Sequence, residues 1–200
     1  MTLVRLGDLD MTLPLAAAAF CWMAAARAWR TAMLWGLLFG GGVMLVGASK
    51  IAFMAWGSGL PALGFKAVSG HATGVTAVFP TVFYLMLQGG GPALRRSAVV
   101  AGVGLGLLVG VLLVVYGFHT AAEAMAGCLL GAAISLAWIR LAGASAVAPS
   151  LARLGWFALA FLAGAWLMSF AHVGWWMIRV ATFLSGNDRP FPLGGADSLC

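Results

Sequence analysis

Long apolar stretches separated by short charged connections run through most of the chain, and they restrict what it can fold into. Six such segments lie at residues 12–29, 32–55, 72–88, 97–117, 118–139 and 154–178. Each is close to the roughly 20 residues that an α-helix needs to cross the hydrocarbon core of a bilayer. A backbone in lipid must satisfy its own hydrogen bonds, and the alternating strands of a membrane barrel are absent, so these segments are expected to be helices.

The composition favours a membrane protein over a soluble domain. Of the 200 residues, 63% are apolar and 8% are charged, whereas soluble domains carry about 25% charged residues. The sequence therefore predicts an all-α, polytopic membrane bundle of six transmembrane helices that forms a single domain over residues 1–200. Its core is expected at 32–140, with extra spans at 12–29 and 154–178 and an irregular tail rich in Gly and Pro at 184–200.

The charged residues are divided unequally between the two sets of connections. One side holds six arginines and no acid: Arg27, Arg30, Arg95, Arg96, Arg140 and Arg153. The other side holds all five acids together with the remaining five basic residues. The positive-inside rule then predicts that the six arginines face the cytoplasm of a bacterial cell and that both termini lie outside its inner membrane. The scattered basic residues form no stripe of the kind that binds nucleic acid, so no nucleic-acid partner is expected.

Polar side chains in or beside membrane helices are costly and therefore mark candidate functional residues. On the predicted outer side, Lys50 ends the second segment, Lys66 lies in the following loop, and Ser69, Gly70 and His71 immediately precede the third segment. A helix N-terminus offers unpaired N–H groups to an anion, and Ser69 is a good N-cap residue. A plain helix cap beside a surface histidine is the alternative interpretation.

His119 and Glu123 form a second polar group, at the start of the fifth segment. Residues four apart share one helix face, and a carboxylate there can hold an imidazole in one tautomer. An interfacial pair without chemistry is the alternative. Two histidines and a glutamate could bind zinc in principle, but the residue order and the lone carboxylate differ from di-metal bundle motifs, and no metal is expected.

These residues together resemble the three motif blocks of the membrane-bound type 2 phosphatidic acid phosphatase and vanadium haloperoxidase superfamily. The first block, a lysine followed seven and eight residues later by Arg-Pro, is represented by Lys50. The second, Pro-Ser-Gly-His, reads Val68-Ser69-Gly70-His71. The third, Ser-Arg, five residues, His, three residues, Asp, reads Leu112-Leu113, five residues, His119, three residues, Glu123. The resemblance covers roughly residues 7–140.

The chain departs from the family pattern at both arginines. Gly57 and Leu113 occupy their positions, and Glu123 replaces the aspartate. Because a transferring phosphoryl group needs its oxygens neutralised, other cations are needed. The candidates on the outer side are Lys66, His172 and Arg179.

The resemblance implies a metal-independent lipid phosphate phosphatase without a cofactor, acting at the periplasmic face of the membrane. By this likeness His119 attacks phosphorus to form a phosphohistidine, Glu123 orients His119, and His71 protonates the leaving group and then activates water. The phosphate oxygens would be held by Lys50, Ser69, Gly70 and Lys66. The expected partner is a lipid phosphate in the bilayer, and the oligomeric state is left open.

The loss of both arginines leaves two other functions open on the same fold. One is a lipid-phosphate-binding or scaffold protein that has lost turnover. The other is a lipid phosphotransferase that passes the phosphoryl group to another lipid or a sugar.

Overall fold

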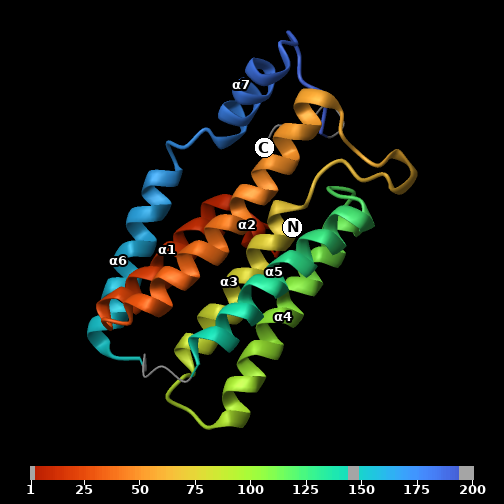
Figure 1. Cartoon of the computed structure of the whole chain (residues 1–200). Helices are drawn as coiled ribbons and strands as arrows, with labels where there is room; N and C mark the ends of the chain where they lie inside the picture. The colour runs from red at the N-terminus through yellow and green to blue at the C-terminus, as the bar shows by residue number, and fades with distance from the viewer. Residues whose placement is uncertain (1–2, 144–148, 194–200) are drawn as a thin grey trace.

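The structure, a computed structural model, describes residues 3–143 and 149–193. Within these ranges it is all-helical, as predicted, and no strand is present beyond one isolated bridge between Leu60 and Phe65. The α-helices are α1 (Leu9–Ala25), α2 (Trp29–Trp56), α3 (Gly70–Met86), α4 (Pro92–Val115), α5 (Ala121–Ala142), α6 (Leu151–Met168) and α7 (Val173–Ser185) (Figure 1). Two short 3-10 helices, η1 (Val4–Gly7) and η2 (Pro61–Leu63), lie in the connections.

Helix α3 is the inner helix of the bundle and packs against α1, α4 and α5. Most of its residues are buried, in contrast to α6, which has no buried residue. Glycine on the neighbouring helices permits this close packing. At Gly131 of α5, a Cβ atom would lie 2.5 Å from the carbonyl oxygen of Thr73, so a larger residue would push α5 away from α3.

Four helices of the described chain, α2, α4, α5 and α6, are long and apolar enough to cross a membrane, and α1 is a shorter apolar helix. This finding supports the predicted membrane class. The prediction of six transmembrane helices is not confirmed, because α1 and α3 each contain only 17 residues.

The predicted continuous helix at 154–178 is wrong. Helix α6 ends at Met168 and α7 begins at Val173. The hydroxyl of Ser169 donates to the carbonyl of Trp166 at 2.6 Å, and the ring of His172 lies 3.0 Å from the carbonyl of Phe170. Such local side-chain bonds compete with continued helical hydrogen bonding.

Helix α7 packs on the end of α2, where Met54, Ala55 and Ala181 form a small buried cluster. Trp175 and Trp176, expected at the end of the sixth segment, therefore lie on a separate helix. The tail becomes irregular at Gly186, two residues after the predicted start at residue 184. The rest of that prediction, residues 194–200, lies outside the described residues.

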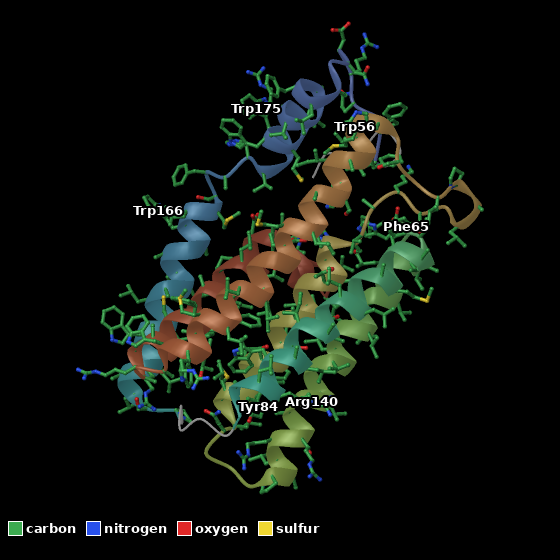
Figure 2. The ribbon with its side chains drawn as sticks, in the orientation of Figure 1. Trp56, Phe65, Tyr84, Arg140, Trp166 and Trp175 are labelled. Atoms are coloured by element: carbon green, nitrogen blue, oxygen red, sulfur yellow. The ribbon has the colours of Figure 1, made fainter. Side chains whose placement is uncertain are left out.

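The connections alternate between the two ends of the bundle. The α1–α2 and α3–α4 connections, the end of α5 and the start of α6 lie at one end, and the α2–α3 and α4–α5 connections lie at the other (Figure 1). Figure 2 shows Tyr84 and Arg140 at the first end and Trp56, Phe65 and Trp175 at the second. The loops that hold the predicted site residues therefore share one end of the protein.

Candidate functional site

Four segments converge at this end of the bundle. They are the turn before α1, the last two turns of α2, the start of α3, and the start of α5. The last three carry residues predicted from the sequence, the turn before α1 carries Asp8, and the contacts between these residues define the site.

Ser69 begins α3 as the sequence predicts. Its hydroxyl oxygen accepts a hydrogen bond from the N–H of Ala72 at 3.4 Å, and its own N–H donates to the carbonyl of Glu123 at 3.2 Å. Ser69 is fully buried. The start of α3 is thus tied directly to the first turn of α5.

The expected contact between His119 and Glu123 is present. His119 Nδ1 lies 2.9 Å from Glu123 Oε2. His119 precedes the N-cap Thr120, and Glu123 is the third helical residue, so Thr120 and Glu123 form a capping box in which side chain and backbone bond reciprocally. With Nδ1 engaged by the carboxylate, Nε2 is the ring nitrogen that remains for chemistry.

Glu123 joins three parts of the site. Oε2 also accepts from the N–H of Thr120 at 3.2 Å, and Oε1 accepts from the N–H of Lys66 at 3.0 Å. The residue is only 5% exposed. Because a glutamate at this helix position can reach back to the N-cap N–H, Glu123 both caps α5 and holds the ring of His119.

Asp8 is a site residue that the sequence reasoning missed. Its Oδ1 lies 2.9 Å from Nε2 of His71. The neighbouring Gly7 packs against the same histidine, and a Cβ atom there would lie 2.8 Å from the Cβ of His71. The available signal was weak: Asp8 lies on the predicted outer side, just before the first apolar segment.

The two imidazole rings lie near each other. The ring centroids of His71 and His119 are 6.3 Å apart. Lys50 reaches the same place, because a Cβ atom on Gly70 would lie 3.8 Å from Lys50 Nζ. Its ammonium interacts electrostatically with Glu123 and with His71. Two imidazoles, an ammonium and the N-terminus of α3 therefore lie together, which is a donor set suited to an oxyanion.

The remaining candidate cations lie elsewhere. Lys66 joins the site through its backbone N–H, while its ammonium donates to the carbonyl of Leu193 at 3.0 Å. Arg179 lies over the ring of Trp175, with 5.0 Å from its Cζ to the ring centroid. His172 is exposed between α6 and α7 and bonds to the carbonyl of Phe170. Across residues 3–143 and 149–193, no three histidine, cysteine or acidic side chains are placed to hold one metal ion.

The two positions at which the resembled family carries arginine have different environments in this chain. Leu113 is 1% exposed in an apolar cluster with Val75 and Val109. Gly57 ends α2 with a φ of 65°, in the left-handed region. Neither position supplies a charge to the space between the histidines.

A bacterial protein is similar to this chain over almost its whole length. The "Uncharacterized 22.5 kDa protein in cps region" of Klebsiella pneumoniae is 34% identical over 191 residues, which are 92% of this chain and 91% of the relative. The chain belongs to the family of this protein. The bacterial source of this family member agrees with the bacterial setting expected from the sequence. No family model matches the chain, and no solved structure matches it.

Proposed function

We propose that this chain is an integral membrane lipid phosphate phosphatase that hydrolyses a phosphomonoester or pyrophosphate headgroup through a phosphohistidine. One observation carries the proposal: two imidazoles, each held by its own carboxylate, lie 6.3 Å apart beside the ammonium of Lys50. This distance allows both rings to act on one phosphoryl group. The resemblance of the three motif blocks to the phosphatidic acid phosphatases adds support.

In the first step, Nε2 of His119 attacks phosphorus. Glu123 accepts a hydrogen bond from the Nδ1–H of His119, which keeps the lone pair on Nε2 and stabilises the positive charge that develops on the ring. The phosphorus–nitrogen bond forms as the bond to the leaving oxygen breaks. His71, held by Asp8, donates the proton that the leaving alcohol or phosphate needs.

In the second step, water attacks the phosphohistidine. His71 accepts a proton from that water, the phosphorus–nitrogen bond breaks, and inorganic phosphate leaves with His119 restored. Lys50 and the N–H of Gly70 neutralise the phosphate oxygens in both steps. Ser69, which is fully buried, holds Gly70 in place through its cap on α3.

We place the site at the periplasmic face of a bacterial inner membrane. The six arginines flank the connections at the opposite end of the bundle, which the positive-inside rule assigns to the cytoplasm. We further propose that α1 to α6 all cross the bilayer. A helix of 17 residues is about 26 Å long, so α1 and α3 would need local thinning of a core of about 30 Å.

A second function is favoured by the positions of the missing arginines. Leu113 is buried among apolar side chains and Gly57 has no side chain, so neither provides a substitute cation. Loss of a preorganised donor commonly costs about 10²–10³ in rate. A protein that binds a lipid phosphate without turning it over is therefore the alternative.

One assay separates these functions. The purified protein in detergent is given phosphatidic acid, phosphatidylglycerol phosphate or an isoprenoid pyrophosphate, and both phosphate release and lipid binding are measured. Release of phosphate from any of them supports the phosphatase. Saturable binding without release favours the binding protein, and the absence of both contradicts both proposals.

The role of His71 predicts a dependence on the leaving group. His71→Ala should slow hydrolysis of an alkyl phosphate by about 10²–10³ and that of an activated aryl phosphate much less, because an aryl oxide leaves without protonation. Asp8→Asn should also slow hydrolysis of the alkyl phosphate more than hydrolysis of the aryl phosphate, but by a smaller factor. Asp10→Asn, two residues away and exposed, is the matched control and should resemble the wild type on both substrates. Equal losses on the two substrates would show that His71 and Asp8 act only on the structure.

A further inference from the structure

An apolar groove runs between α2 and α5 on the membrane-facing surface. It is lined by Leu38, Gly41, Gly42 and Leu45 of α2 and by Leu130 and Ile134 of α5, together with alanines of α5. Its volume is about 340 Å³, within the range of roughly 300–1,000 Å³ found for small-molecule sites. Its side chains offer no hydrogen-bonding group.

The walls of this groove lead to the candidate site. On α2, Gly42 packs against Ile134, and Val46 and Lys50 follow on the same face at intervals of four residues. Val46 and Lys50 both contact the position of Gly70 at the start of α3. On α5, Leu130 follows Glu123 by seven residues, about two turns. The lining of the groove therefore shares one face of α2 with Lys50 and one face of α5 with Glu123.

The depth of the groove matches one leaflet of a bilayer. At 1.5 Å per residue, Leu45 lies about 8 Å and Leu38 about 18 Å from Lys50 along α2. Half of a hydrocarbon core is about 15 Å thick. A lipid whose phosphate lies beside Lys50 would therefore extend its hydrocarbon chain along the length of the groove.

We infer that the α2–α5 groove holds a hydrocarbon chain of the lipid whose phosphate lies between His71, His119 and Lys50. This inference rests on the proposed function and adds the part of the substrate that the protein recognises. Charge complementarity selects this occupant, because the groove is lined only by apolar side chains, and Lys50, which lies near the two histidines, follows Leu45 on α2 by about 8 Å. A second cavity between α2 and α5, lined in part by Arg30 and Thr31, is at the opposite end of the bundle from the histidines.

Two adjacent glycines allow a matched test. A Cβ atom at Gly40 or at Gly41 would have no atom within 4 Å, so a side chain can leave the backbone at either position without a clash at its first carbon. Gly41 lines the groove and Gly40 does not. Gly41→Leu therefore fills the groove, and Gly40→Leu adds the same side chain to the same helix outside it.

The two variants and the wild type are assayed on dipalmitoyl and dihexanoyl phosphatidic acid. Gly41→Leu should lower kcat/KM for the dipalmitoyl lipid about tenfold, the equivalent of roughly two methylene groups losing their burial. The dihexanoyl lipid should be hydrolysed at the wild-type rate, and Gly40→Leu should match the wild type on both. Unchanged activity of Gly41→Leu on the long-chain lipid, or an equal loss on both lipids, would overturn the inference.

A second readout does not depend on turnover. A phosphatidic acid with a diazirine in its acyl chain is photolysed with the protein, and labelled peptides are identified by mass spectrometry. The expected result is labelling around Leu45 and Ile134 that Gly41→Leu removes and Gly40→Leu retains. Equal labelling by a diacylglycerol with the same chains would show bulk lipid in the groove and refute the inference. A change from dimer to monomer on Gly41→Leu, measured by light scattering, would assign the groove to a second copy instead. If the wild type releases no phosphate but gives the expected labelling, the groove assignment stands while the proposed catalysis fails.

Discussion

His119→Ala should reduce phosphate release from a lipid phosphate by about a thousandfold or more. The substitution removes the nitrogen proposed to form the covalent bond to phosphorus, and water cannot replace it without a separate activating group. The same variant should form no phosphoenzyme when the reaction with radiolabelled substrate is quenched in base, where phosphohistidine survives. Wild-type protein should give a labelled band that acid removes.

The matched control for this prediction is His172→Ala. His172 is exposed between α6 and α7 and bonds to a local carbonyl, so its loss should leave both phosphate release and the labelled band intact. If His119→Ala retained a tenth of wild-type activity, another residue would be the nucleophile. A radiolabelled phosphoenzyme band of wild-type intensity in His119→Ala would lead to the same conclusion.

Glu123→Ala should damage both stability and activity. The change leaves the N–H groups of Lys66 and Thr120 and Nδ1 of His119 without their partner in a partly buried position. Each unpaired buried group costs about 1–3 kcal/mol, so a loss on the order of 3 kcal/mol in the free energy of unfolding is expected. A drop of several degrees in the thermal midpoint, measured in detergent with a thiol-independent dye or by circular dichroism, would report it.

Glu123→Gln separates the two effects. Its amide oxygen can still accept from His119 or from a backbone N–H, so the thermal midpoint should fall less than in Glu123→Ala. Phosphate release should still fall by about 10² or more, because a neutral amide stabilises the charged ring of His119 poorly and favours the wrong tautomer. Asp10→Ala is the control for the loss of an exposed acid. Wild-type activity in Glu123→Gln would contradict the proposed role of the carboxylate.

Several local features of the site were predictable because they depend on neighbours in the sequence. Ser69 caps α3, since a serine before an apolar helix satisfies a free N–H group. His119 and Glu123 meet because residues four apart at the start of a helix lie on one side of it. The position of Lys50 at the same end of the bundle was also predictable, because Lys50 lies near the end of the second apolar segment and the loop that carries Ser69 and His71 follows that segment. The lengths of the apolar segments also predicted an all-helical membrane protein.

The failures involve residues whose environment depends on packing or on a few local polar atoms. Hydropathy is high throughout 154–178, so it did not reveal the break made by Ser169 and His172. The ammonium of Lys66 was expected at the phosphate, but it bonds to the carbonyl of Leu193. That contact joins residues 127 positions apart, and no local pattern predicts it.

The sequence alone determined that the chain is helical and apolar enough for a bilayer, and which polar residues share one end of it. Those properties follow from segment length, local capping and the distribution of charge. Only the tertiary structure paired Asp8 with His71 across 63 positions and brought the N–H of Lys66 to Glu123 across 57. The physical reason is that these contacts depend on how η1, α3 and α5 pack, and packing is decided by the shapes of facing side chains over the whole bundle.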